Sequence, residues 1–203
     1  ELALEHAPWQ PRIAATALAF QNKIWIMGGF SFDTFVHYND VWYSSDGHHW
    51  ELATEHAPWS VRGMHGSVVF NDRIWIIGGG TYNTAYPNNT VADYGDVWNS
   101  SDGEKWELAV STAEWTARRF HSSVVYDGKI WIMAGYHYGN RNDVWFSSDG
   151  KCWQEVQIDP KWAIRHEPMC LVFDDRLWMM GGFGDRLYND IWTYTKPRTN
   201  NQL

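Results

Sequence analysis

An internal repeat that occurs four times is the feature that most constrains the fold of this 203-residue chain. Each unit contains Trp-x-x-Arg, then an apolar run around a second Trp that ends in Gly-Gly or Ala-Gly, and then Asp-Val-Trp or Asp-Ile-Trp. The second Trp is residue 25, 75, 131 and 178, so the units are spaced by 50, 56 and 47 residues. This period is typical of a propeller blade and not of a helical repeat.

Each unit is predicted to contain four short β-strands. The β-branched and aromatic runs are bounded by Gly, Asn and Asp, and no unit has a ten-residue stretch with helical periodicity. In the second unit we expect strand A at 67–70, strand B at 74–76, strand C at 96–98, and strand D from the Ser-Asp-Gly turn through Trp106. Strands A and B are nearly continuous apolar runs, as expected for sheets buried on both faces. Sheets stacked around an axis have this property, so the sequence predicts an all-β propeller.

The order of these landmarks resembles the Kelch repeat in its tryptophan-rich bacterial form. The resemblance covers residues 9 to about 195 and is specific, because the landmarks recur in the same order four times. It implies a β-propeller whose blades have four antiparallel strands, with strand A nearest the central channel. We expect one domain over residues 1–203. Its predicted repeats span about 9–58, 59–114, 115–161 and 162–195.

The terminal segments bear on how the ring closes. Residues 1–3 match the residues that follow the strand D Trp in the first two units, so 1–8 are expected to end an outer strand D. The fourth unit lacks its own Ser-Asp-Gly turn and following Trp. Kelch propellers usually have six or seven blades, so three arrangements remain open: closure in cis, completion by a second copy of the chain, or part of a larger propeller. Exposed blade faces are a solubility hazard, which favours a second copy.

Charge and hydropathy exclude two classes of partner. The chain has 24 acidic and 16 basic residues, which gives a net charge of −8. We expect no nucleic-acid partner, because such affinity depends on clustered Lys and Arg that displace counterions. No apolar run approaches the roughly 18 residues that span a bilayer, so we expect no membrane partner. The two cysteines form no disulfide framework, and the localisation is left unknown.

A ring of arginines is the first candidate site. The resemblance places the loop before strand A at the channel mouth, and rotational repetition brings one position of each unit to that opening. Converging guanidinium groups suit a carboxylate or another anion through paired hydrogen bonds. In the alternative, each Arg stacks on the neighbouring Trp or pairs with the Asp before strand C and belongs to the repeat framework. The ring consists of Arg12, Arg62, Arg118 and Arg165, with Arg119 adjacent.

Two histidines follow these arginines at a position that varies between units. His65 and His121 stand where the other units have Ala15 and Pro168, which favours a ligand contact. By the resemblance, however, a His at the start of strand A is also common in Kelch units. Two histidines are too few for a metal site. The copper ligands and Cys–Tyr crosslink of galactose oxidase, which shares this fold, are not reproduced, so we expect no cofactor.

The loops after strand B differ most in length between units and are rich in aromatic residues. Loops on rigid scaffolds carry function, and flat amphipathic rings bind a sugar face or a peptide at low entropic cost. In the alternative, these rings only pack loop against loop. The predicted ligand contacts are Tyr82, Tyr136, His137, Tyr138 and Arg186, and other aromatic residues of these loops include Phe30, Phe32, Tyr86 and Phe183.

These features predict a non-enzymatic binding module that recognises a protein, peptide or glycan at the channel mouth. The rival is a carbohydrate-active enzyme, because the fold also resembles that of sialic acid mutarotases and galactose oxidase. An enzyme needs a positioned acid or base. The candidates for that role are Glu167, Asp185, His65 and His121, and we assign no catalytic residue.

Overall fold

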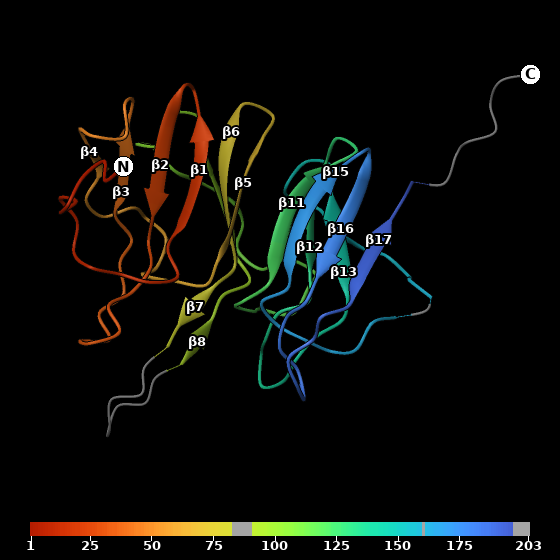
Figure 1. The fold of residues 1–203 in the computed structure, drawn as a ribbon. Helices are drawn as coiled ribbons and strands as arrows, with labels where there is room; N and C mark the ends of the chain where they lie inside the picture. Colours follow the sequence, from red (N-terminus) through yellow and green to blue (C-terminus); the bar gives the residue numbers. More distant parts are fainter. Residues whose placement is uncertain (83–90, 160, 197–203) are drawn as a thin grey trace, which may run out of the picture.

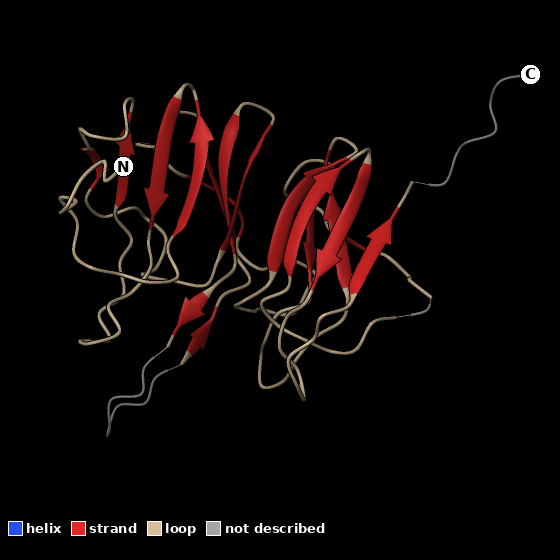
Figure 2. Ribbon diagram, viewed as in Figure 1, coloured by secondary structure: helices blue, strands red, loops and turns tan. Residues whose placement is uncertain are grey.

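The computed structural model describes residues 1–82, 91–159 and 161–196. Over these ranges the chain forms strands, turns and loops, and it contains no helix. No described segment is therefore a helix long and apolar enough to cross a membrane. The predicted all-β propeller is confirmed, with four small antiparallel sheets standing as four blades (Figures 1 and 2).

The strands follow the order of the repeat. Blade 1 contains β1 (Thr16–Phe20), β2 (Lys23–Met27), β3 (Val41–Ser44) and β4 (Glu51–Thr54). Blade 2 contains β5 (Gly66–Phe70), β6 (Arg73–Ile77), β9 (Val97–Ser100) and β10 (Glu107–Val110). Blade 3 contains β11 (Ser122–Tyr126), β12 (Lys129–Met133), β13 (Val144–Ser147) and β14 (Gln154–Glu155). Blade 4 contains β15 (Met169–Phe173), β16 (Arg176–Met180) and β17 (Ile191–Tyr194). A small ribbon of β7 (Gly80–Thr81) and β8 (Ala92–Asp93) belongs to the long loop of blade 2.

Within a blade the strands lie in sequence order from strand A to strand D. Strands A and B are joined by a two-residue turn, and in blade 2 both turn residues, Asn71 and Asp72, have positive φ angles of 49° and 53°. Asn and Asp tolerate this conformation, which matches the twist of a hairpin. The A strands β1, β5, β11 and β15 contact one another in that order and line the axis. The loops that enter strand A pair with the loops that leave strand B, so both meet at one end of the axis.

Neighbouring blades pack through apolar faces that the repeat builds at fixed positions. Trp25 of β2 is 1% exposed and covers Gly103 in the Ser-Asp-Gly turn of blade 2, where a Cβ would overlap the indole ring. Trp75 covers Gly150 in the same way, one blade further along. Each pair of neighbouring blades shares one continuous apolar cluster. The recurrence of Trp in strand B and Gly in the turn therefore reflects one contact made between successive blades.

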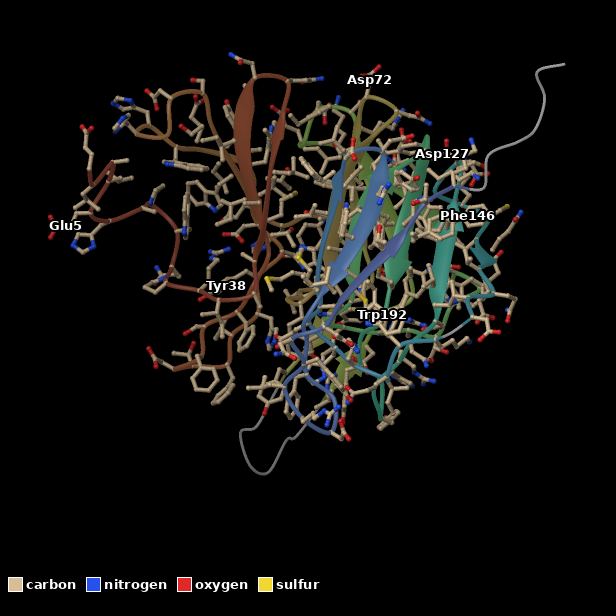
Figure 3. The ribbon with its side chains drawn as sticks, turned by 45° about the vertical axis from the view of Figure 1, so that its right-hand side comes forward. Glu5, Tyr38, Asp72, Asp127, Phe146 and Trp192 are labelled. Carbon is tan, nitrogen blue, oxygen red and sulfur yellow. The ribbon has the colours of Figure 1, made fainter. Side chains whose placement is uncertain are left out.

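Blade 4 differs from the others because it has three described strands. The sequence predicted this difference from the missing Ser-Asp-Gly turn and Trp, and β17 is the last strand of the sheet. Figure 3, turned to bring this side forward, shows the strands of blade 4 in front with Trp192 on the last of them.

Candidate ligand-binding site

Each repeated arginine is bound to a carboxylate of its own blade. The Arg62 guanidinium donates hydrogen bonds to both oxygens of Asp96, at 2.6 and 2.8 Å, and to the carbonyl oxygen of Gly78 at 2.8 Å. Its side chain is fully buried. The same two-pronged contact joins Arg12 to Asp40, Arg118 to Asp143 and Arg165 to Asp190.

These contacts explain why two motifs recur together. Asp96 also accepts a hydrogen bond from the indole N–H of Trp98 at 2.7 Å, so the Arg of Trp-x-x-Arg and the Asp and Trp of Asp-Val-Trp form one unit. We call this unit the strut, and it ties the loop before strand A to strand C in every blade. Hydrogen bonds from Arg165 lower the pKa of Asp190 to about 2. The guanidinium groups of the repeated arginines already donate hydrogen bonds to these carboxylates. That they also contact a ligand stays a prediction.

The second residue after each repeated arginine has a left-handed backbone conformation. The φ angle is 55° at Ala14, 57° at Met64, 59° at Phe120 and 53° at Glu167. Backbone hydrogen bonds join these four residues, from Met64 N to Ala14 O (3.0 Å), from Phe120 N to Met64 O (2.9 Å) and from Glu167 N to Phe120 O (2.8 Å). We call the four residues the collar. Such a conformation costs a non-glycine residue on the order of 1 kcal/mol, and strain of this kind gathers at functional sites.

A pocket of about 680 Å³ opens next to the collar. All four blades contribute to its wall, which is mostly aromatic, and its volume falls within the range of small-molecule sites. We call it the axial pocket. It is lined by Ile13, Ala14, Phe30, Phe32, Tyr82, Arg119, Phe120, Tyr136, His166 and Glu167.

Arg119 supplies the buried cation of the axial pocket. Its Nη1 donates a hydrogen bond to Asp93 Oδ1 at 2.6 Å, and its guanidinium carbon lies 5.2 Å from the centre of the Tyr136 ring. The other oxygen of Asp93 lies 2.8 Å from Nδ1 of His137. The Arg119 Nε–H is buried and has no hydrogen-bond partner among the described residues. Because an unpaired buried donor is costly, a hydrogen bond to this N–H would stabilise the site.

His166 and Glu167 add the remaining polar groups. Nδ1 of His166 lies 2.6 Å from Oδ1 of Asn140, and the His166 ring packs edge-on against Tyr136 with 5.6 Å between centroids. Burial lowers the pKa of His166, so its imidazole is neutral at neutral pH. The wall therefore combines a guanidinium, a neutral imidazole and the Glu167 carboxylate with aromatic surface.

The two histidines predicted from the sequence lie in a neighbouring cavity and not in the wall of the axial pocket. Nε2 of His65 lies 2.8 Å from Oγ1 of Thr16, whereas neither ring nitrogen of His121 has a partner within the described part of the chain. Burial, assisted by the charges of Arg62 and Arg118 respectively, lowers the pKa of each histidine to about 3. Their cavity of about 350 Å³ shares collar residues with the axial pocket. Their ligand contact stays a prediction.

The predicted loop residues are only partly brought together. Tyr82 and Tyr136 line the axial pocket, and His137 is connected to it through its carboxylate partner. Tyr138 is 90% exposed, and the Arg186 guanidinium lies 5.4 Å from a neighbouring tyrosine ring. Neither of these two residues lines the pocket.

Sequence reasoning missed Phe120 and His166 as wall residues, although a signal was present. The two positions after the repeated Arg read Ile-Ala, Gly-Met, Arg-Phe and His-Glu in the four units, while the Arg itself does not change. A position that differs in every unit is not required by the framework and can serve one asymmetric ligand. Tyr86, another aromatic residue singled out in these loops, lies outside the described residues.

A metal centre has no support in the part of the chain that the structure describes. Within it, no group of three or more His, Cys, Asp or Glu side chains is placed to hold a metal ion.

Comparison with known proteins supports the architecture. No protein-family model matches the chain, and no curated protein matches it. Among solved structures, the chain is similar to the one titled "Structure of YjhT", with a TM-score of 0.71 and 16% sequence identity over 87% of this chain. The chain is a β-propeller. At this identity the similarity shows the fold alone, and the match spans 61% of the length of YjhT.

Proposed function

We propose that this β-propeller is a Kelch-type module that binds a carbohydrate in the axial pocket and catalyses no reaction on it. One observation carries the proposal: the pocket wall is built from residues that differ between the repeats, whereas the repeated residues are used in struts and blade interfaces. Because a fold does not determine a function, the choice of ligand rests on the chemistry of this wall.

The aromatic part of the wall suits a sugar ring. Phe30 and Phe32 from blade 1 have ring centroids 6.5 Å apart, and Tyr136 from blade 3 lines the same pocket. The C–H faces of a pyranose pack on such rings, while its hydroxyl groups need a few well-placed donors and acceptors. The pocket offers both kinds of surface at once.

The polar part of the wall favours a hydroxyl-rich ligand over a strongly anionic one. The positive charge of Arg119 is already paired with Asp93, which lies behind the wall, and Glu167 adds a negative charge to the wall itself. The unpaired Nε–H of Arg119 donates to a sugar oxygen, and the Glu167 carboxylate accepts from a sugar hydroxyl. Hydrogen bonds to charged groups are the stronger ones, so these two contacts orient the ring.

A glycan array followed by calorimetry tests the proposal. We expect a glycan to bind the wild type and Phe32→Ala to weaken that binding about tenfold, or about 1.4 kcal/mol, because a stacking surface is lost. The melting temperature should change little, since Phe32 is 60% exposed. Tyr138→Ala is the matched control, as an exposed aromatic outside the pocket. Equal losses in both variants, or binding on a peptide array alone, would contradict the proposal.

A second candidate function, a sugar-transforming enzyme, is favoured by the presence of Glu167 beside His166 in the wall. In that case Glu167 acts as a general base within reach of a sugar hydroxyl. NMR of the interconversion of sugar anomers distinguishes the two functions. Acceleration by the wild type that is lost in Glu167→Gln supports the enzyme. No acceleration by a wild type that binds the sugar supports the binding module.

A further inference from the structure

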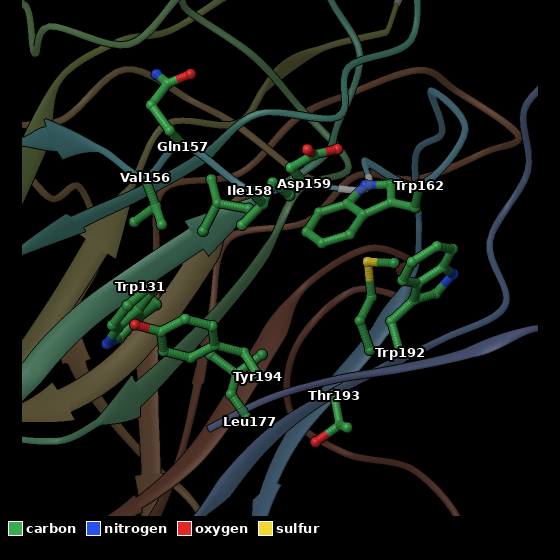
Figure 4. Close-up of a pocket in the computed structure, with 12 residues that line it drawn as sticks. Trp131, Val156, Gln157, Ile158, Asp159, Trp162, Leu177, Trp192, Thr193 and Tyr194 are labelled. Carbon is green, nitrogen blue, oxygen red and sulfur yellow. The ribbon is translucent and has the colours of Figure 1, made fainter. Parts of the chain in front are cut away.

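Histidine rings line several cavities of the molecule, but their nitrogens bind different partners. His166 lines the axial pocket, and His65 and His121 line the neighbouring cavity. His37 and His56 line a third cavity, beside blade 1. The cavity of about 430 Å³ between blades 3 and 4, shown in Figure 4, has no histidine among its described lining residues. Within the described part of the chain, only His37 accepts a hydrogen bond from a backbone N–H.

The two hydrogen bonds of His37 fix which of its nitrogens carries the proton. Nδ1 lies 3.0 Å from the carbonyl oxygen of Phe35, which can only accept, so Nδ1 carries the hydrogen and donates it. The Tyr82 N–H donates to Nε2 at 2.8 Å, so Nε2 presents its lone pair. The His37 ring is 9% exposed and stacks on the Phe30 ring, with 4.8 Å between their centroids. The structure therefore holds His37 as a neutral ring with both nitrogens bonded.

The contact with His37 fixes one part of the axial pocket wall. Tyr82 directly follows β7, and its ring centroid lies 6.4 Å from that of Phe30, which lines the same pocket. The other strand of the ribbon, β8, is held through Asp93, whose Oδ2 lies 2.8 Å from Nδ1 of His137. The two histidines respond differently to acid. His137 can donate from Nδ1 in either protonation state, whereas Nε2 of His37 cannot accept a hydrogen bond once it is protonated.

The groups around His37 provide no ion pair for an added proton. Burial lowers the pKa of His37, and the hydrogen bond to the Phe35 carbonyl opposes this effect. Arg12 and Asp40 bind each other, and in the described part of the chain no carboxylate is hydrogen-bonded to the His37 ring. The titratable groups of its cavity and of the ribbon next to it are Arg12, Tyr38, Asp40, Glu55, His56 and Tyr82.

We propose that protonation of His37 detaches Tyr82 from blade 1 and thereby weakens ligand binding in the axial pocket at acidic pH. A protonated Nε2 faces the Tyr82 N–H as one donor against another, so their hydrogen bond is lost. The buried positive charge further disfavours the closed arrangement. The effect on binding rests on the function proposed above, whereas the detachment of Tyr82 depends on no ligand.

The pH range of the effect follows from the two states of His37. In the detached state the ring contacts water and titrates near the ordinary histidine pKa of 6.5, whereas its pKa in the closed state is lower. Between these two pKa values the detached state binds more protons, so detachment becomes more favourable as the pH falls below about 6.5. The equilibrium constant for detachment therefore rises by up to about tenfold from about pH 7.5 to about pH 5.5.

Hydrogen exchange of the Tyr82 amide, measured by NMR on the full chain, tests the detachment without a ligand. We expect its protection factor to fall by up to about tenfold over this pH range. The Tyr94 amide is the internal control, because it donates to the carbonyl oxygen of Gly79, which does not titrate. His37→Gln provides an acceptor that does not titrate and should remove the pH dependence, whereas His56→Gln should retain it. A pH-independent protection factor in the wild type, or an unchanged pH dependence in His37→Gln, overturns the proposal.

Calorimetry with the array-selected glycan at the same two pH values tests the effect on binding. We expect the affinity of the wild type to fall by up to about tenfold in acid, and that of His37→Gln to fall less. His166 and Glu167 of the wall are the same in both proteins, so the difference between them reports His37. No fall in the wild type, or an equal fall in both proteins, overturns the effect on binding. If no glycan binds at all, the proposed function fails, and hydrogen exchange still decides whether His37 controls Tyr82.

Discussion

Arg118 and Arg119 are neighbours in the chain but belong to two different regions of the molecule. Arg118 is fully buried in a strut that recurs in every blade, where Asp143 accepts both prongs of its guanidinium. Arg119 lines the axial pocket, binds Asp93 from a distant loop and retains an unpaired Nε–H. The side chain that occurs four times ties the loops of the scaffold together, and the side chain that occurs once lines the pocket in which we propose that a ligand binds. If the proposed site is right, positions that differ between the repeats indicate the ligand site better than the repeated positions do.

The largest effect should follow from removing a strut. Arg118→Ala leaves the partly buried Asp143 carboxylate without its cation and should lower the free energy of unfolding by about 3 kcal/mol. Denaturant titration measures this change. The control is Arg73→Ala, whose partner Glu107 is 70% exposed, and surface pairs contribute less than about 1 kcal/mol. If Arg118→Ala kept its stability and lost ligand binding, the repeated arginines would be ligand contacts, as the sequence alone suggested.

The pH dependence of stability should come mainly from His65 and His121, the two histidines whose pKa is lowered to about 3. His65 and His121 have a pKa of about 3 when folded, against 6.5 for an exposed histidine. Between these values the unfolded chain binds more protons, so stability falls as the pH decreases below about 6.5. At about pH 5 each histidine should account for a loss of about 2 kcal/mol. His121→Gln should reduce the slope in acid denaturation curves, whereas exposed His56→Gln should not. Identical slopes in both variants would show that His121 is not buried in the neutral form.

The smallest of the three effects concerns the axial pocket. Arg119→Lys keeps a cation beside Asp93 but removes the planar fork and its Nε–H, and the two side chains are not interchangeable at such sites. We expect about tenfold weaker binding of the array-selected glycan, or about 1.4 kcal/mol, with a smaller loss of stability than in Arg118→Ala. Calorimetry and thermal melting of the same samples measure both quantities. Unchanged affinity would remove Arg119 from the site.

The fold was largely predictable, because the same order of strand and turn residues occurs four times in the sequence. Even the fourth blade, of which three strands are described, was predicted to differ because its unit lacks the turn and the Trp of strand D. The partners of the repeated guanidinium groups were not predictable from the sequence. A ring of arginines near a channel mouth can bind an anionic ligand, and it can equally bind four carboxylates of the protein itself. The left-handed backbone of the collar could not be predicted either. A left-handed backbone is not typical of the residue types found there, which are Ala14, Met64, Phe120 and Glu167. In the folded chain, hydrogen bonds between neighbouring blades join these four residues.

Arg119 shows why the site itself was harder to predict than the scaffold. Its partner Asp93 belongs to the β7–β8 ribbon, which among the described residues only blade 2 has, so no repeated spacing connects the two residues. Tyr82 and Tyr136 were found because loop aromatics are conspicuous in the sequence, but Tyr138, which follows Tyr136 by two positions, points into solvent. A contact that is made only once, between residues of different blades, produces no repeating pattern in the sequence.

A crystal structure of the protein with the array-selected glycan tests the central claim most directly. The claim predicts a sugar ring packed against Phe32 or Tyr136, with an oxygen within hydrogen-bond distance of Arg119 Nε and a hydroxyl at the Glu167 carboxylate. A glycan bound on the outer edges of the blades, or in the cavity between blades 3 and 4, would contradict it.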